Sequence, residues 1–119
     1  MSRSNLIQEK TFDFSLKIID LHEILIDHKQ FVIAKQLLKS STSIGANVEE
    51  AIAAQSKKDF LSKMCISSKE ARETKYWLRL LDKSQIIIMD YSSYLNDIDD
   101  LINILTKIVK TTSENLRKS

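Results

Sequence analysis

The near absence of glycine and proline is the feature that most constrains the fold of this chain, because its 119 residues include one Gly and no Pro. These two residues form most turns and bulges, so a chain that lacks them favours long helices. Hydrophobic residues make up 43% of the chain and charged residues 29%, which is too apolar for disorder and sufficient for a core. At this length we expect one domain, residues 1–119, with loose tails at 1–5 and 114–119.

Apolar residues recur every three or four positions in four segments, which predicts four helices. We expect them to span residues 6 or 11 to 26, 31–53, 57–82, and 90 or 92 to about 113. Ser56 and Asp59 form a cap signal for the third helix. Residues 84–90 could be taken for a strand, but without a second strand we interpret them as a connection packed over the bundle end. Short connections predict an all-α, antiparallel up-down-up-down four-helix bundle.

The first two expected helices carry features that bear on packing. The core stripe of the first comprises Phe14, Ile18, Leu21 and Leu25, widened by Phe12, Leu16 and Ile19. In the second, Gly45 lies in mid-helix, where glycine is about 1 kcal/mol less favourable than alanine. We therefore expect a neighbouring helix or another subunit to approach the backbone closely at Gly45.

Polar residues occupy positions where a bundle normally places leucine. Residues 44 and 51 are apolar, and helical spacing then places Asn47 inward. Glu70 and Glu73 share a helix face with Trp77, which we expect to be largely buried at a helix or subunit seam. Because buried polar groups are unfavourable without partners, we expect a hydrogen-bonded layer between the second and third helices. Its expected members are Ser43, Asn47, Glu50, Glu70 and Glu73.

Several kinds of active site are disfavoured by the residues present. The two histidines are not in the Glu-x-x-His pairs of a di-iron bundle, and one Gly cannot build a phosphate-binding loop. The single cysteine, Cys65, excludes an internal disulfide and is expected to be a semi-buried structural thiol. We expect no catalytic residue, no metal ligand and no cofactor. The absence of a long apolar run or a signal peptide predicts a cytoplasmic protein without a membrane span.

One enzymatic alternative remains open at this stage. Glu70-x-x-Glu73 and Asp97-x-x-Asp100 loosely resemble the acidic pairs with which all-helical nucleotide pyrophosphohydrolases hold magnesium. The plainer interpretation is that Asp97 and Asp100 favour the dipole of the first turns of their helix. Glu70 and Glu73 can equally pair with a neighbouring lysine or with Asn47. We therefore rank a magnesium-dependent nucleotide hydrolase below the non-enzymatic functions.

Positive charge is concentrated on the third helix. Residues 56–89 carry 8 basic and 4 acidic side chains, whereas residues 1–55 and 90–119 are each net −1. The candidate nucleic-acid-binding residues lie close to one line: Lys58, Lys69, Arg72, Lys75, Arg79 and Lys83. At 1.5 Å per residue this row spans about 37 Å, enough to follow several phosphates. Without aromatic residues interleaved on this face, base stacking and sequence-specific readout are not expected. The alternative is an ordinary solvated face.

Three segments carry a resemblance to a known family: SSTSIGANVEEA (40–51), SKKDF (56–60) and KEARETKYWLRLL (69–81). They resemble the four-helix bundle proteins encoded by intervening sequences within large-subunit ribosomal RNA genes. Distant relatives are the accessory variability proteins of diversity-generating retroelements. The signature residues are Ser43, Ile44, Asn47, Glu49 or Glu50, Phe60, Glu70 and Glu73. Many members have Pro at the position of Gly45 and Gly at that of Ala51, which bears on local helix geometry.

The resemblance implies an up-down bundle, usually a homopentameric ring, with no established catalysis. For the retroelement relatives it implies binding of RNA or DNA and of a polymerase. Together with the six candidate basic residues of the third expected helix, it favours a non-enzymatic oligomeric adaptor with weak, non-sequence-specific affinity for nucleic acid. The alternative is a purely structural or protein-interaction module.

Overall fold

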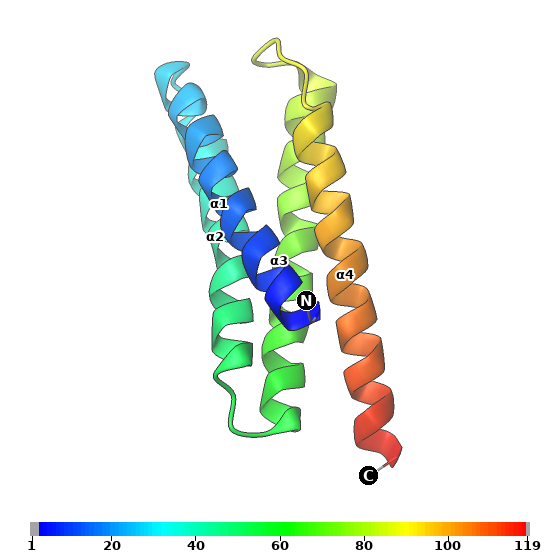
Figure 1. Ribbon diagram of the computed structural model, residues 1–119. Coiled ribbons are helices and arrows are strands. Elements are labelled where there is room, and N and C mark those ends of the chain that lie inside the picture. Colours follow the sequence, from blue (N-terminus) through cyan, green and yellow to red (C-terminus); the bar gives the residue numbers. More distant parts are fainter. Residues whose placement is uncertain (1–2, 119) are drawn as a thin grey trace.

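The computed structural model describes residues 3–118, which form four helices joined by short connections (Figure 1). The helices are α1 (Arg3–Asp27), α2 (Phe31–Ile52), α3 (Lys57–Ser84) and α4 (Ser92–Lys118). Each helix packs against the next one along the chain, and α4 meets α1 through a smaller contact. The bundle measures 51 × 25 × 21 Å. The expected all-α, up-down-up-down four-helix bundle is confirmed.

The helix ends are formed by local side-chain and backbone hydrogen bonds. The Ser56 hydroxyl accepts a hydrogen bond from the Asp59 amide at 3.0 Å, which confirms the expected cap of α3. At the other end of α3, Gln85 adopts a left-handed conformation with φ 47°, and its amide donates to Leu81 O. At the start of α4, Asp90 Oδ1 accepts hydrogen bonds from the amide and the hydroxyl of Ser92. These bonds lower the pKa of the Asp90 carboxyl below its ordinary value, the hydroxyl bond most strongly.

The expected loose tails are wrong where the structure describes them. Helix α1 already begins at Arg3, and α4 continues to Lys118, so residues 3–5 and 114–118 are helical. Neither segment contains glycine or proline to end a helix. Arg117 and Lys118 lie in the last turn of α4, where positive charge interacts favourably with the helix dipole. Residues 1–2 and 119 of the expected tails lie outside the described part of the chain.

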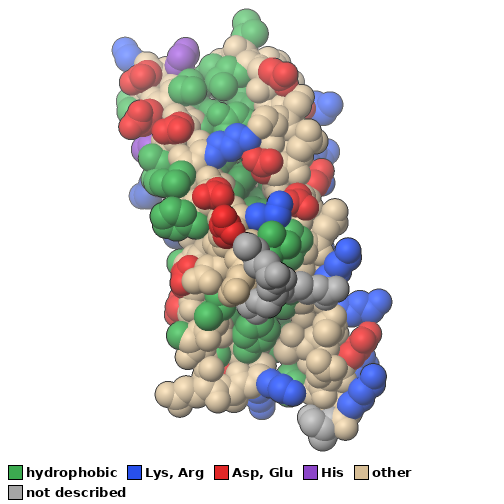
Figure 2. Space-filling view, in the orientation of Figure 1, with side chains coloured by type: hydrophobic (Ala, Val, Ile, Leu, Met, Phe, Trp, Pro, Cys, Tyr) green, Lys and Arg blue, Asp and Glu red, His purple; other side chains and the backbone are tan. Residues whose placement is uncertain are grey.

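The core is formed by the apolar stripe of each helix. On α1 the expected residues Phe14, Ile18, Leu21 and Leu25 are all buried. The expected widening of this stripe is wrong, because Phe12 is 63% exposed and both Leu16 and Ile19 are also exposed. These three residues follow a separate line around the helix, since at 3.6 residues per turn they point well away from the stripe. Figure 2 shows hydrophobic side chains on the outer surface along α1.

The connection between α3 and α4 contains no strand, as expected, and covers the end of the bundle only in part. Ile87 and Tyr91 are buried, whereas Ile86 and Ile88 are exposed. The Tyr91 hydroxyl donates a hydrogen bond to Ile87 O at 2.8 Å. Burial raises the pKa of the Tyr91 phenol above its ordinary value, with smaller contributions from the charges of Tyr94 and Asp82. Nowhere between residues 3 and 118 is a helix sufficiently long and apolar to span a bilayer.

Candidate nucleic-acid interface

A layer of buried hydroxyl groups joins α2 to α3, but it is not the layer expected from the sequence. Ser40, Ser67 and Thr74 are fully buried. The Ser67 hydroxyl donates to Ile44 O at 2.8 Å, and the Thr74 hydroxyl lies 2.9 Å from the Ser40 hydroxyl. Hydroxyl groups are small enough to let two helices approach closely while each finds a partner. Every buried polar side-chain atom in residues described by the structure has a hydrogen-bond partner.

Asn47 does not reach across to Glu70. Its side-chain amide donates to Ser43 O at 2.9 Å and to Ser43 Oγ at 3.1 Å, both within α2. Asn47 and Glu70 are each half-buried at the edge of the α2–α3 contact. Half-exposed side chains are partly solvated, so they need no partner across the interface. The expectation of a layer built on Asn47 and Glu70 is therefore wrong.

Of the other members of the expected layer, Ser43 is half-buried, whereas Glu50 and Glu73 lie on the surface. Glu50 is exposed and pairs across to Lys63 of α3 at 3.6 Å. Glu73 is exposed and accepts a hydrogen bond from Trp77 Nε1 at 3.2 Å, within α3. Trp77 itself is half-buried, less than expected, because its indole lies at the edge of the bundle where Nε1 can reach Glu73. The exposed ion pair between Glu50 and Lys63 contributes less than about 1 kcal/mol to the stability of the fold.

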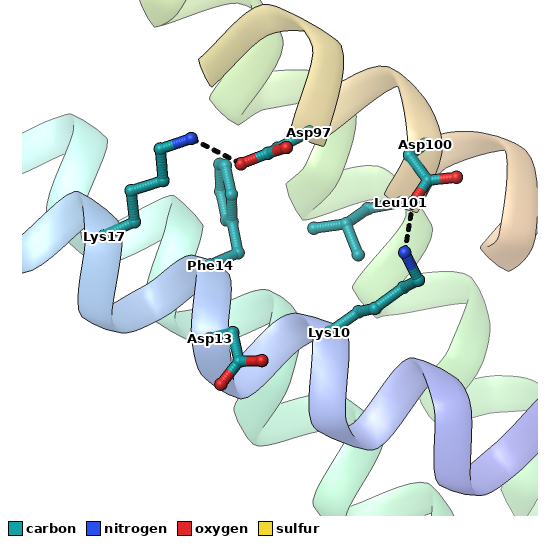
Figure 3. Close-up of a pocket in the computed structure, with 7 residues that line it drawn as sticks. All are labelled: Lys10, Asp13, Phe14, Lys17, Asp97, Asp100 and Leu101. Carbon is teal, nitrogen blue, oxygen red and sulfur yellow. Dashed lines mark hydrogen bonds and ion pairs between the residues drawn. The ribbon is translucent and has the colours of Figure 1, made fainter. Parts of the chain in front are cut away.

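Charged residues also gather in a cleft between α1 and α4, where Figure 3 shows two ion pairs crossing from one helix to the other. Lys10 Nζ lies 2.8 Å from Asp100 Oδ2, and Lys17 Nζ lies 2.7 Å from Asp97 Oδ2. The pKa of the Lys10 amine is raised, mainly by its hydrogen bond to Asp100 and by the charge of that carboxylate. Lys17 also hydrogen-bonds to Ser93 and lies 5.0 Å from the centre of the Tyr94 ring.

These ion pairs account for the acidic pair of α4 that suggested a magnesium site. Asp97 and Asp100 each hold a lysine of α1, so their charge is already balanced. Among residues 3–118 there is no group of three or more His, Cys, Asp or Glu side chains placed to hold a metal ion. The cleft is therefore best described as an electrostatic contact that fastens α1 to α4.

The six candidate nucleic-acid-binding residues all lie on α3, and most of their charge is unopposed. Lys75 is half-buried and pairs with Asp99 of α4 at 2.7 Å. The other five are exposed and have no ion pair within the part of the chain that the structure describes: Lys58, Lys69, Arg72, Arg79 and Lys83. This contrasts with the α1–α4 cleft, where both lysines are neutralised. We call these five side chains the basic row.

Two arginines of the basic row border a groove between α3 and α4. The groove is lined by Arg72, Lys75, Tyr76, Arg79 and Ile102. The Tyr76 side chain is 54% exposed. The expectation that no aromatic residue is interleaved with the basic residues is therefore wrong. The signal was available in the sequence, because Tyr76 follows Arg72 by four positions and precedes Arg79 by three, which places all three on one helix face.

Cys65 lies on the exposed side of α3 as a free thiol. The expectation of a semi-buried structural cysteine is wrong, since its neighbour Met64 occupies the core position and Cys65 points outward. The exposed location leaves the thiol accessible to reagents in the folded chain.

Two groups of exposed apolar side chains stand out among the residues that the structure describes. One is the outer face of α1, with Phe12, Leu16 and Ile19 exposed. The other is a groove between the start of α2 and the end of α3, whose lining includes Phe31, Val32, Ile33, Trp77, Leu80 and Ile86. Contiguous exposed apolar surface of this kind commonly marks an interaction site.

Comparisons with known proteins agree with this fold. Residues 3–107 match the family model described as 23S rRNA-intervening sequence protein. A crystal structure of a protein of unknown function from the S23 ribosomal protein family of Bacteroides thetaiotaomicron is similar, with a TM-score of 0.86 and 40% sequence identity. The similarity covers 92% of this chain and 99% of that one. No protein with a curated function matches the chain significantly.

Proposed function

The chain belongs to the 23S rRNA-intervening sequence protein family, and from that premise we propose that it is a non-enzymatic oligomeric adaptor that binds nucleic acid. The observation that carries the proposal is the basic row of α3. Its five cations project from one helix and none is used in an ion pair within residues 3–118. The binding is weak and non-sequence-specific, and it takes place in the cytoplasm.

The physical basis of this binding is the release of counterions from the phosphate backbone. Each lysine or arginine that neutralises a phosphate releases counterions, so the affinity falls steeply as salt increases. Lysines and arginines already paired with carboxylates contribute little to this effect. The paired residues Lys10, Lys17 and Lys75 are therefore excluded from the main contact, and the exposed cations of α3 provide it.

The test is fluorescence anisotropy with a labelled oligonucleotide of mixed sequence. We expect binding at low salt and a linear decrease of log K with log salt concentration. The double variant Arg72→Glu/Arg79→Glu should bind roughly tenfold more weakly and have a salt slope smaller by about 1 to 2. The matched control is Lys35→Glu/Lys39→Glu, which makes the same change in net charge at two exposed lysines of α2. It should bind as the wild type does.

Two results would contradict the proposal. One is the absence of binding at low salt by folded protein of unchanged mass. The other is an equal loss of affinity in the α2 control, because that would assign the effect to net charge and not to the face of α3.

We also propose that the chain forms a homo-oligomer through its uncovered apolar surface. The exposed side chains of Phe12, Leu16 and Ile19 on α1 support this, since a monomer would leave them in water. A ring of subunits, such as a pentamer, would repeat the basic row around its surface and strengthen a weak contact through multivalency. Light scattering coupled to size-exclusion chromatography gives the mass directly, and a monomer at micromolar concentration would refute this part.

The second candidate function is a protein-interaction module without nucleic-acid binding. It is favoured by the apolar groove at the start of α2, where Phe31 and Val32 are exposed beside Leu80 and Ile86 of α3 and its following turn. A distant relation to retroelement accessory proteins would make a polymerase a natural partner. A pull-down with wild type and Val32→Asp tests this second function. A protein partner that docks in the groove should be captured by wild type and lost in the variant.

A further inference from the structure

Tyr76 has three properties that suit it to contact a ligand. More than half of its surface is exposed, and it lines the same groove as two arginines that make no ion pair with any residue described by the structure. Its ring also contacts the Trp77 ring, with centroids 5.1 Å apart and planes inclined by 71°. This edge-to-face contact restricts the ring and lowers the entropy that it would lose on binding a ligand.

The groove around Tyr76 suits a strand segment of about three nucleotides with a base at its centre. The ring offers an aromatic surface, and Ile102 of α4 adds an apolar wall. Arg72 and Arg79 lie on either side, about 10 Å apart along the helix axis at 1.5 Å per residue. This separation matches about three nucleotides of a strand that rises 3.4 Å per residue. Lys75 and Asp99 neutralise each other at the border of the groove, so their charges neither attract nor repel a phosphate strongly.

We propose that Tyr76 stacks on an unpaired base while Arg72 and Arg79 hold the flanking phosphates, so that the preferred ligand of this groove is single-stranded nucleic acid. The inference rests on the nucleic-acid binding proposed above and adds the kind of strand that is bound. Stacking is the step that selects the strand. In a duplex, each base face is covered by its neighbours, whereas the bases of a single strand can be splayed out and stacked on an aromatic side chain.

The test combines side-chain variants with strands that lack bases. Binding by wild type, Tyr76→Ala and Tyr76→Phe is measured on four ligands: a ten-nucleotide RNA, a DNA strand of the same sequence, the corresponding duplex and a ten-residue abasic strand. Because stacking of a base on an aromatic side chain adds to affinity, Tyr76→Ala should lower affinity for either single strand roughly tenfold. Tyr76→Phe retains the ring and should change it less than twofold. Affinity for the duplex should be unchanged in both variants.

The abasic strand isolates the contact between ring and base. Wild type should bind it roughly tenfold more weakly than a strand with bases, and Tyr76→Ala should bind both strands equally. Tyr76→Leu keeps an apolar contact with Trp77 without an aromatic ring, so it should behave as Tyr76→Ala does if stacking is the cause. Circular dichroism establishes that each variant is folded.

The two proposals fail in different ways. If wild type binds strands with and without bases equally, or if Tyr76→Ala retains wild-type affinity for both single strands, stacking is refuted and phosphate binding stands. If wild type binds no ligand at low salt, both proposals are refuted. A comparable loss of duplex binding in Tyr76→Ala would also overturn stacking, because the side chain would then act through the shape of the groove.

Discussion

Replacing Gly45 by alanine should stabilise this protein. Gly45 lies within α2 without a positive φ, so its backbone is one that alanine adopts readily. A Cβ atom placed there would lie 3.5 Å from Thr11 Cβ, 3.5 Å from Thr11 Oγ1 and 3.6 Å from Thr11 O. These are ordinary van der Waals distances. The neighbouring helix expected at Gly45 is α1, and it leaves room for a methyl group.

The magnitude follows from helix propensity. Alanine is favoured over glycine in a helix interior by about 0.8–1.0 kcal/mol. The new methyl group would not displace the Thr11 hydroxyl from its partners, because that hydroxyl already donates within α1, 2.8 Å from Ile7 O and 3.1 Å from Gln8 O. An unfolding entropy of about 2.1 cal/mol/K per residue gives ~250 cal/mol/K for this chain, so the expected rise in Tm is about 4 °C.

The assay is thermal and urea denaturation at one fixed protein concentration, which holds any contribution from oligomerisation constant. The matched control is Ala46→Gly, at the exposed neighbouring position, which should lower stability by a similar amount. The exchanged pair Gly45→Ala/Ala46→Gly should then return close to the wild-type value. If Gly45→Ala instead lowers the free energy of unfolding, the space beside Thr11 is smaller than the structure indicates and the argument fails.

Three further predictions follow from side chains whose location the sequence did not predict correctly or left undecided. Ser67→Ala should lower the free energy of unfolding by about 1 kcal/mol, because it removes the hydrogen bond between α3 and α2, while Asn47→Leu should have little effect. If denaturation shows a larger loss for Asn47→Leu than for Ser67→Ala, the hydroxyl layer is not what joins the two helices. Tyr91→Phe should lower the free energy of unfolding by about 1 kcal/mol near pH 7, because it removes the hydrogen bond from the Tyr91 hydroxyl to Ile87 O. Because burial raises the Tyr91 pKa, wild type should lose stability as pH rises above about 10, and Tyr91→Phe should lose less; parallel pH curves would refute this. Cys65 should react rapidly with Ellman's reagent in the native state, whereas slow reaction would show that an oligomer covers it.

The architecture was predictable from the sequence because one kind of signal repeats along the whole chain. Apolar spacing of three and four, with almost no glycine or proline, leaves a helical bundle as the natural outcome. The cap at Ser56 was predictable for a different reason, since it depends only on residues three positions apart. Helix ends without such a local signal, as in α4, were placed several residues too early.

The polar contact between α2 and α3 was harder to predict because spacing alone does not fix how deeply a side chain is buried. Ser40, Ser67 and Thr74 belong to uninterrupted core stripes, and their small hydroxyls can be fully buried because each has a hydrogen-bond partner nearby. Asn47 and Glu70 are larger and more polar, and a rotation of the helix by a fraction of a turn leaves them at the solvated edge. The smaller polar residues therefore form the layer.

The observed hydroxyl layer bears on the proposed assembly of subunits. A layer of Asn47 and Glu70 could have joined subunits as well as helices, but the observed hydroxyl layer is satisfied within one chain. The surface that remains to be covered is apolar and lies elsewhere, at Phe12 and its neighbours on α1 and at the groove beside Phe31. Subunit association would accordingly depend on hydrophobic burial, while the face of α3 that carries the basic row stays free.

The acidic residues of α4 explain why that face is positive. Asp97 and Asp100 pair with lysines of α1, and Asp99 pairs with Lys75 of α3. An unpaired carboxylate at the α3–α4 groove would repel a phosphate held by Arg72 or Arg79. Lys75 removes that repulsion and at the same time ties α4 to α3. The Lys75–Asp99 ion pair thus helps to close the bundle and neutralises one carboxylate of α4, and for this reason Lys75 differs in role from the five residues of the basic row.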